Sequence, residues 1–573
     1  MQALKITLAI LLTAVLSHVN VNAFEANYHA EVLGPLNDIT DWNSFDQELA
    51  RLKVSGVTAI ATDVWWGRVE ASGDQQFDWS YYHTQVQHIR DAGLMWVPIL
   101  STHQCGGPGQ SCNIPLPSWL NLNSTPDAQY KSIYGSTTID AIAPWYSAGY
   151  DQYNQLFSAF ANAFSGYNNI IARIDLSGGH SGELKYPSYV TDNWNYPGRG
   201  QLMAYSDAAV ADFKNWVTNK YTNIVNLNAA WGSNLASMND MTPPCDTTTE
   251  TNTASIVDVC DNKTGADTFF SNGVDTTYGH DFLTWYQGVM ETHGATMMTK
   301  AKAHFDGAFP NKPIAFKLAG LHWQYFSPTQ PRATEIAAGY YNYTSMINAL
   351  KTMGAEATFT AIEMNDNNSY PDYSGAKTLS QEFFNLCKNL GLVCNGENAN
   401  SISEGEEYKF GNMRSMIYDH DVDALSHLRY NDFGNVTVAK FYANYVATMN
   451  TNQKILWFLI KGVPTELNER LTVTGSNGAL GNWSPSSGLP MTTFNCVGNV
   501  CDWAGMAVVS GTPNIQWKIV RDSSSDTDWQ CGNNSSVQIN SRVTNIYINT
   551  GKNSDTTNNE IRHIDMDGIS VCE

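Results

Sequence analysis

The sequence has little charge, and most of that charge is acidic. Asp, Glu, Lys and Arg make up 15% of the 573 residues, against roughly 25% in an average soluble domain. There are 32 Lys and Arg against 54 Asp and Glu, which gives a formal net charge of -22. Phosphate backbones and anionic lipid surfaces repel such a chain, so we exclude nucleic acid and membranes as its main partners.

Long apolar runs are missing as well. The apolar run at residues 6–16 follows Lys5 and is too short for a bilayer crossing, which needs about 20 residues. It is followed by Val21-Asn22-Ala23, a small-residue end that is typical of signal peptidase cleavage after Ala23. We therefore predict that residues 1–23 are a secretory signal peptide and that the protein is extracellular.

The ten cysteines lack the C-x-x-C pairs of a structural zinc site, so we do not expect them to bind metal. In an exported chain they should form disulfides. Their spacing leaves other connectivities open but favours pairing of neighbours: Cys105 with Cys112, Cys245 with Cys260, Cys387 with Cys394, Cys496 with Cys501, and Cys531 with Cys572. In a eukaryotic host, N-glycosylation is expected at the sequons of Asn123, Asn262, Asn342, Asn367, Asn435, Asn482, Asn533 and Asn534.

Aromatic side chains are abundant instead, with 17 Trp, 28 Tyr and 22 Phe. Hydrophobic residues make up 43% of the chain, which is enough for a sizeable core. Aromatic rings suit neutral polar ligands that have apolar faces, sugars above all, but the same count also fits a core rich in Trp. Composition alone leaves both interpretations open.

The chain is too long for one domain of about 100 to 250 residues. From about residue 28 to 430, short apolar runs alternate with helix-like stretches. This pattern favours an α/β fold, a (β/α)8 TIM barrel with insertions, although periodicity alone does not exclude a doubly wound sheet. The expected strands are residues 30–36, 57–65, 95–100, 170–176, 313–318, 357–364, 392–394 and 424–428. Residues 247–275, rich in Thr, Asn and Asp, are predicted to be a surface loop clipped by a disulfide.

The pattern changes after the barrel region. Short alternating segments at 455–460, 470–474, 515–520 and 543–548 are separated by Gly, Asn, Ser and Pro clusters, which is typical of a small all-β sandwich. We therefore predict three regions: the signal peptide at 1–23, the barrel domain at 24–449 and the β-sandwich domain at 450–573.

Polar residues at the ends of barrel strands gather at one mouth of the barrel. They are Asp63, His103, Glu183, Lys317, His322, Thr360, Glu397, Asn398 and Arg429. Glu183 and Glu397 follow the fourth and seventh predicted strands, on opposite sides of the mouth. Glycoside hydrolysis needs such a pair: one protonated acid, and one carboxylate that activates water or attacks the sugar. Trp65, Trp66 and Trp323 lie near enough in sequence to stack on sugars. The alternative is a pair of structural glutamates.

Several motifs resemble those of the β-amylase family, in the same order along residues 28 to 440. They are Thr62-Asp-Val-Trp-Trp-Gly, Ser101-Thr-His-Gln-Cys-Gly-Gly, Asn113-Ile-Pro-Leu-Pro, Ser181-Gly-Glu-Leu-Lys-Tyr-Pro-Ser-Tyr, Tyr196-Pro-Gly-Arg-Gly, Gly320-Leu-His-Trp, Phe359-Thr-Ala-Ile-Glu-Met and Asn395-Gly-Glu-Asn-Ala.

The resemblance implies an exo-acting, inverting hydrolase that releases β-maltose from the non-reducing ends of α-1,4-glucans such as starch and needs no cofactor. Glu183 would be the general acid and Glu397 the general base, with carboxyl groups about 6.5 to 9.5 Å apart to leave room for water. Because the acid must keep its proton, we expect an apolar or like-charged setting around Glu183. By the same resemblance, the residues that bind sugar hydroxyls or hold the base are Asp63, His103, Lys317, His322, Asn398, Ala399 and Arg429, and Thr360 would stabilise Glu397 after cleavage.

Two stretches depart from the family pattern. The family's flexible lid usually reads Gly-Gly-Asn-Val-Gly-Asp, whereas here it reads Gly106-Gly-Pro-Gly-Gln-Ser-Cys112. This lid is one residue shorter and lacks the carboxylate that helps to bind the end glucose. Neutral hydrogen bonds from Gln110 or Ser111 would have to replace it. Asn400 stands where plant members carry Leu, which weakens apolar packing against the leaving sugars.

The segment from Glu70 to Gln75 resembles the calcium-binding loop of bacterial β-amylases. Calcium takes six to eight oxygen ligands, and this loop offers Glu70 and Asp74, with Gln152 and Gln155 as further oxygen donors. Only two of these are carboxylates, so a calcium ion would be weakly bound and structural in role. The alternative is a solvated acidic turn before a helix.

The last region resembles the common starch-binding β-sandwich. The motifs are Leu480-Gly-Asn-Trp, Cys501-Asp-Trp, Ile515-Gln-Trp-Lys and Thr527-Asp-Trp-Gln-Cys-Gly-Asn. The resemblance implies a platform of Trp483 and Trp529 that stacks on α-glucan, with Lys518 and Asn533 as polar partners. Trp503 is expected in the core.

Two other functions remain open. A glucan-binding protein would keep the fold but lose turnover through its altered lid. A different α-glucanase would release other products or cleave internally. In each case the expected partner is starch or a related α-1,4-glucan, and the expected state is a monomer.

Overall fold

The computed structural model describes residues 29–107, 110–191, 194–244, 269–406, 408–420, 422–449, 453–464, 469–522, 527–529, 534–539, 543–549 and 561–562. The predicted signal peptide, the Cys245–Cys260 and Cys531–Cys572 pairs, most of the 247–275 loop and Asn533 lie outside these residues.

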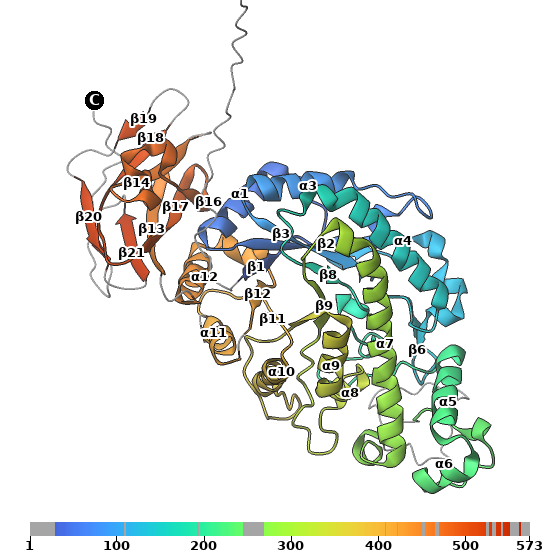
Figure 1. The fold of residues 1–573 in the computed structure, drawn as a ribbon. Coiled ribbons are helices and arrows are strands. Elements are labelled where there is room, and N and C mark those ends of the chain that lie inside the picture. Colours follow the sequence, from blue (N-terminus) through green and yellow to red (C-terminus); the bar gives the residue numbers. More distant parts are fainter. Residues whose placement is uncertain are drawn as a thin grey trace, which may run out of the picture.

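Eight parallel strands close into a barrel in the order β1-β12-β11-β10-β9-β8-β3-β2 (Figure 1). Their bounds are β1 His29–Leu33, β2 Ala59–Trp65, β3 Met95–Ser101, β8 Ile174–Leu176, β9 Ile314–Leu318, β10 Glu356–Phe359, β11 Cys394–Glu397 and β12 Ala424–His427. The closed order confirms the predicted TIM barrel and excludes a doubly wound sheet.

Several predicted strand limits differ from the structure; the first strand, for example, ends at Leu33 and not at residue 36. The fourth begins at Ile174, not at residue 170. The sixth ends at Phe359, because Ala361 has a positive φ of 70° that no strand allows. The seventh runs over Cys394–Glu397 instead of 392–394, since Gly391 ends the preceding helix in a left-handed conformation and Leu392 still donates to Cys387 of that helix. Glu397 is therefore the last residue of its strand.

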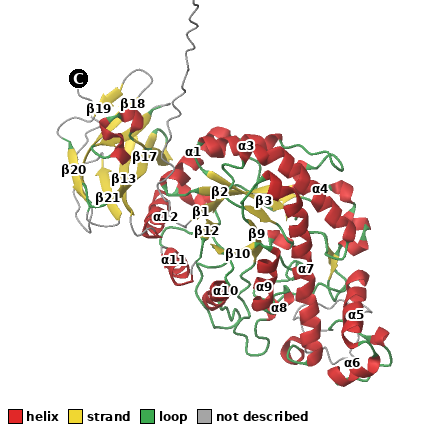
Figure 2. Cartoon of the chain, in the orientation of Figure 1, coloured by secondary structure: helices red, strands yellow, loops and turns green. Residues whose placement is uncertain are grey.

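Helices surround the barrel (Figure 2). They are α1 Trp42–Val54, α2 Trp66–Val69, α3 Ser80–Asp91, α4 Ser147–Phe164, α5 Asp207–Tyr221, α6 Ile224–Trp231, α7 Thr277–Ala308, α8 Ala333–Ala337, α9 Tyr343–Met353, α10 Ala376–Leu390, α11 Tyr408–His420 and α12 Val436–Met449. Helix α9 shows how the sequence sets their limits. Asn342 caps its start by accepting a hydrogen bond from the Ser345 amide, and Gly354 ends it in a left-handed conformation.

The C-terminal region forms two packed sheets, ordered β16-β17-β13-β21-β22 and β15-β14-β18-β19, with β20 paired to β18. The strands are β13 Gln453–Pro464, β14 Arg470–Gly475, β15 Leu489–Pro490, β16 Thr492–Val497, β17 Val500–Ser510, β18 Asn514–Asp522, β19 Thr527–Trp529, β20 Ser535–Gln538, β21 Val543–Asn549 and β22 Ile561–Arg562. This is the predicted all-β sandwich. Trp503 is buried in its core. Helix α12 ends at Met449 and β13 begins at Gln453, on either side of the predicted boundary at residue 450.

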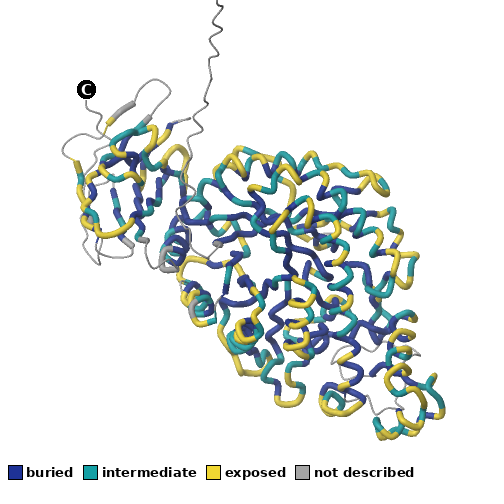
Figure 3. Tube along the Cα trace, in the orientation of Figure 1, coloured by how far each residue is buried: buried dark blue, intermediate teal, exposed yellow. Residues whose placement is uncertain are grey.

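Buried residues run through both the barrel and the sandwich (Figure 3). Three predicted disulfides are present: Cys105–Cys112, Cys387–Cys394 and Cys496–Cys501. In the described part of the chain, none of the helices has the length and apolar character that a bilayer crossing would demand.

Candidate active site

Glu183 reaches the mouth through a tight turn after β8. The turn contains Gly182, whose φ is +79°. A Cβ on this glycine would lie 3.1 Å from the ring of His103, so a larger residue would strain the turn and press on the histidine. Glu183 then pairs in a parallel bridge with Lys317, and the next amide donates to the Lys317 carbonyl at 2.8 Å. The acid is thereby fixed beside the end of β9 and is 8% exposed.

Glu397 is 4% exposed, and its Oε1 lies 2.5 Å from Nζ of Lys317. Lys317 thus pairs with one carboxylate residue through its backbone and contacts the other through its side chain. Burial raises the pKa of Glu397, the Lys317 ammonium opposes that rise, and the charge of Glu183 adds to it. The two predicted catalytic glutamates therefore lie within each other's electrostatic field.

Burial disfavours the charged form of Lys317, but three carboxylates outweigh that effect. Glu397, Glu183 and Asp63 together raise the pKa of Lys317 above its ordinary value. The lysine is therefore a fixed positive charge at the centre of the mouth.

The setting of Glu183 contains a cation that the sequence analysis missed. Nζ of Lys185, which is fully buried, lies 3.3 Å from Glu183 Oε2 and 4.7 Å from the centre of the Tyr189 ring. The sequence analysis expected an apolar or like-charged setting around Glu183 and did not include this cation. Lys185 stands two residues after the acid in the quoted motif, so its position in the sequence was the available signal.

Asp63 lies on β2, and His103 lies just after the end of the neighbouring strand β3. Ser101 Oγ donates to Asp63 Oδ1 at 2.6 Å. Burial raises the pKa of Asp63, and the bond from Ser101 and the charge of Lys317 oppose that rise. The ring of His103 lies 2.9 Å from Ser177 Oγ, and burial lowers its pKa to about 3. The imidazole is therefore neutral near pH 7 and can both donate and accept hydrogen bonds.

His322 and Thr360 come from the loops after β9 and β10. His322 Nδ1 lies 2.7 Å from Ser374 Oγ, and burial lowers the pKa of His322 to about 4. Thr360 Oγ1 accepts a hydrogen bond from the Gly320 amide at 2.7 Å. The threonine hydroxyl thus joins the two loops and keeps its own proton to donate.

Two buried side chains, those of Asn398 and Glu363, hold the loop after Glu397 through hydrogen bonds. Asn398 is fully buried; its Nδ2 donates to the Asn400 carbonyl at 2.7 Å and its Oδ1 accepts from the Leu428 amide at 2.8 Å. Glu363, which the sequence analysis did not single out, accepts from the amides of Ala399 and Asn400 at 3.0 to 3.1 Å.

Arg429, also predicted at this site, is exposed and donates to the Leu428 carbonyl at 3.0 Å. Asn398 therefore holds the loop that follows Glu397, whereas the Arg429 side chain is exposed.

The lid is a disulfide-closed hairpin. Strands β4 (Cys105–Gly106) and β5 (Asn113–Ile114) pair in antiparallel fashion, and the Cys105–Cys112 disulfide joins them. A cavity of about 450 Å³ beside this hairpin is lined by Asn37, Asp38, Arg68, Asn113, Ile114 and Pro115.

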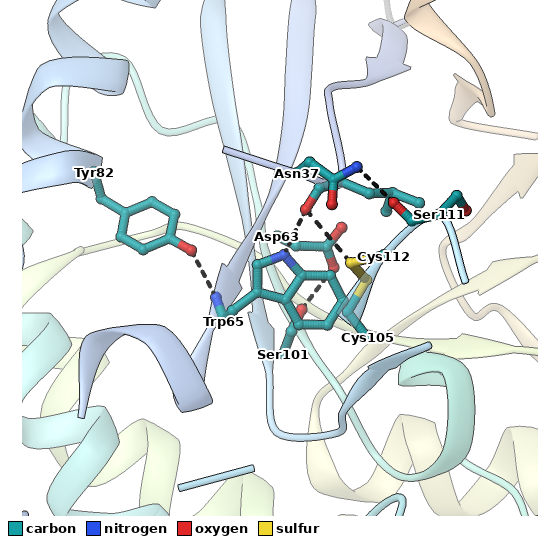
Figure 4. The surroundings of a disulfide bond; sticks show 9 residues. Asn37, Asp63, Trp65, Tyr82, Ser101, Cys105, Ser111 and Cys112 are labelled. Atoms are coloured by element: carbon teal, nitrogen blue, oxygen red, sulfur yellow. Dashed lines mark hydrogen bonds between the residues drawn. A yellow bond between two sulfur atoms is a disulfide. The ribbon is translucent and has the colours of Figure 1, made fainter. Parts of the chain in front are cut away.

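The base of the lid packs on the Trp65 side chain, as Figure 4 shows. Trp65 Nε1 donates to the Leu36 carbonyl at 3.1 Å, and Asn37 Nδ2 donates to the Ser111 carbonyl at 2.7 Å. Asp63 lies next to this cluster in the same view. The lid is therefore attached to the loop after β1 on the Asp63 side of the mouth.

The candidate calcium ligands come from two segments, the loop that follows α2 and helix α4. Glu70 is 1% exposed, and its carboxylate accepts from Trp66 Nε1 at 2.6 Å and from the Gln75 amide at 2.5 Å. Burial raises the pKa of Glu70, and the nearby charge of Asp74 adds to that rise. On α4, the amide oxygens of Gln152 and Gln155 are buried without a hydrogen-bond partner. The described residues hold no group of three or more His, Cys, Asp or Glu suited to a metal.

Of the residues predicted to bind starch, Lys518 lies on β18 and Trp529 on β19. Alternate residues of β18 face the sandwich core, which leaves Lys518 and Val520 on the other face. Val520 pairs with Trp529, and directly opposed residues of antiparallel strands share a face. Trp529 is 36% exposed. Trp483 ends a short 3-10 helix that follows β14.

Comparisons with known proteins agree with this geometry. The model of glycosyl hydrolase family 14 matches residues 31–444, and the model of a starch binding domain matches residues 455–548. The chain belongs to glycosyl hydrolase family 14. Family 14 is the β-amylase family that the sequence motifs resemble, so that recognition is confirmed.

Relatives in family 14 span nearly the whole chain. The thermophilic β-amylase of Thermoanaerobacterium thermosulfurigenes is 41% identical over 91% of this chain and 93% of its own length. The β-amylase of Bacillus cereus is 37% identical over 89% of this chain and 91% of its own. The crystal structure of the catalytic domain of β-amylase from Paenibacillus polymyxa has a TM-score of 0.68 and 40% identity, and covers 74% of this chain and 98% of that chain.

Proposed function

We propose that this family 14 enzyme is a β-amylase that releases β-maltose from the non-reducing ends of α-1,4-glucans. The observation that carries the proposal is the pair of buried carboxylates, Glu183 and Glu397, joined by Lys317, which bridges to Glu183 through its backbone and contacts Glu397 through its ammonium. The relatives that match almost the whole chain are named β-amylases.

In this mechanism Glu183 donates its proton to the glycosidic oxygen as the bond from that oxygen to C1 breaks. Glu397 accepts a proton from a water molecule, which attacks C1 from the opposite face of the ring. One bond to C1 forms as the other breaks, so the new reducing end has the β configuration. Lys317 favours the ionised form of Glu397, which is the form that a general base needs.

The remaining mouth residues bind the sugar or position the base. Asp63 and the neutral imidazoles of His103 and His322 offer hydrogen bonds to sugar hydroxyls. Asn398, Ala399 and Glu363 hold the loop that follows the base. Thr360 keeps a proton with which to stabilise Glu397 after cleavage.

The test compares the Glu183→Gln and Glu397→Gln variants on maltoheptaose. Each amide keeps the shape of the side chain but cannot exchange a proton, so each rate should fall about 100- to 10,000-fold. Glu356→Gln is the matched control, because Glu356 is a barrel carboxylate bonded to Asn395 at the start of β10. Normal turnover in either catalytic variant would overturn the assignment.

We propose a structural calcium ion held by Glu70, Asp74, Gln152 and Gln155. Two buried amide oxygens without partners on α4, and a buried carboxylate at Glu70, are the kinds of oxygen ligand that a hard cation takes. Glu70 and Asp74 supply negative charge, and the ion would fix the loop after β2 against α4.

For the sandwich domain, we propose that Trp483 and Trp529 stack on starch granules while Lys518 and Asn533 bond to sugar hydroxyls. The match to a starch binding domain supports this role.

We also propose that the protein is secreted by means of residues 1–23 and acts as a monomer. A molar mass measured by light scattering that equals the mass of one chain would support the monomer, and a value twice as large would refute it.

A further inference from the structure

A row of aromatic side chains leads away from Glu183. Tyr189 lies near the acid and stands 5.7 Å from Trp323 and 5.2 Å from Trp194, measured between ring centres. Tyr196 stands 5.5 Å from Trp323. We call these four rings, together with Tyr370 on a loop that Gln324 joins to the loop of Tyr196, the aromatic track.

Tyr196 and Tyr370 are the most exposed members of the aromatic track. Trp323 is 8% exposed, Tyr196 is 53% exposed and Tyr370 is 80% exposed. The inner rings pack on one another, whereas the two outer tyrosines present most of their surface to solvent. An exposed tyrosine normally gains little from folding, so two of them at the end of one aromatic row point to a ligand.

One side chain holds both outer tyrosines in place. Gln324 Nε2 donates to the carbonyls of Pro197 and Pro371 at 3.0 and 2.8 Å. These prolines directly follow Tyr196 and Tyr370, so the loops that carry the two tyrosines are tied to one point.

The backbone of the same residue strengthens this tie, since the Gln324 amide donates to the Asp372 carbonyl at 2.9 Å. Burial and the charge of Asp372 both raise the pKa of Tyr196, which places the two loops close together.

The direction of the aromatic track identifies its occupant. The general acid protonates the oxygen that departs with the rest of the glucan, so the leaving chain lies on the side of Glu183. We infer that Tyr196 and Tyr370 form an outer subsite that stacks on glucose units of the leaving α-1,4-glucan chain, beyond the units next to the scissile bond. This inference rests on the proposed function, which assigns the acid to Glu183.

The test compares kcat/KM for maltoheptaose with kcat/KM for maltotetraose in the full-length enzyme. Maltotetraose places two glucose units on each side of the scissile bond, whereas maltoheptaose extends further along the aromatic track. In the Tyr196→Ala/Tyr370→Ala variant, the ratio of the two values should fall about three- to tenfold, since two stacking contacts are lost. The single Tyr370→Ala variant should show part of this fall. Because the Tyr370 side chain is 80% exposed, its removal should not disturb the fold.

The Tyr196→Phe/Tyr370→Phe variant is the matched control and should keep the wild-type ratio, because the rings remain. An unchanged ratio in the double alanine variant would overturn the outer subsite, and so would an equal loss on both substrates. Failure of the wild-type enzyme to release β-maltose would instead overturn the proposed function, so the two failures are distinguishable.

Discussion

At the scale of single residues, Lys317 contacts both of the carboxylate residues to which we assign catalysis. Its backbone pairs with Glu183 and its ammonium contacts Glu397. Burial raises the pKa of Glu397, and Lys317 is the group that most strongly opposes that rise. Without the cation, the base would keep its proton to a higher pH.

The Lys317→Met variant tests this dependence. The general base works only when ionised, so the acidic limb of the pH profile of kcat/KM should move to higher pH, by about one to three units. The measurement is the rate on maltoheptaose between pH 4 and pH 8, on the order of ten points. An acidic limb that stays in place would show that Lys317 does not control the ionisation of Glu397.

Some residues of the site could be predicted from the sequence, and others could not. The strand-end pattern located Glu183, Glu397 and Lys317, because parallel barrel strands bring such residues to one mouth. It could not find Lys185 or Glu363. Lys185 acts through a turn whose path depends on glycine conformations, and Glu363 acts through amides of a loop 36 residues away in sequence.

At the scale of elements, the alternation of apolar runs was enough to predict the barrel strands, but not all of their limits. Periodicity marks which segments are buried, whereas the end of a strand depends on the backbone conformation beyond it. The positive φ of Ala361 ends β10 early, and an alanine in the sequence does not predict such a backbone conformation. The position of Glu397 as the last residue of β11 was missed for a similar reason.

The sheet of β14, β18 and β19 should bind starch independently of catalysis. The Trp483→Ala/Trp529→Ala variant should lose adsorption to raw starch granules, since stacking on the exposed rings is removed, and should still hydrolyse soluble starch. A sedimentation assay with granules measures this. Trp503→Phe, in the sandwich core, is the control for general damage to the domain. Unchanged adsorption of the double variant would refute the platform.

The segment between α2 and α4 should respond to calcium. If the ion joins Glu70 to Gln152 and Gln155, chelation should lower the melting temperature, and added calcium should restore it. Scanning calorimetry with and without a chelator measures the shift. In the Gln152→Leu/Gln155→Leu variant the response should vanish. If chelation and added calcium both leave the melting temperature of the wild-type protein unchanged, the calcium site is contradicted.

At the scale of the whole molecule, the sandwich is docked on the barrel. Along β13, Ile455, Trp457 and Leu459 join the apolar cluster of the barrel, while the residues between them fill the sandwich core. Arg51 of α1 donates to the Thr493 carbonyl at 2.9 Å across the same interface. The sandwich and the barrel are therefore packed together through an apolar seam and a hydrogen bond.

The central claim is that the molecule performs inverting, exo-acting hydrolysis. The most direct measurement is proton NMR of the enzyme acting on maltoheptaose, with the sizes of the fragments and the anomeric signal of the new reducing ends recorded before mutarotation. The account predicts that β-maltose accumulates from the first spectrum onward. Reducing ends in the α configuration, or fragments of mixed length from the start, would contradict it.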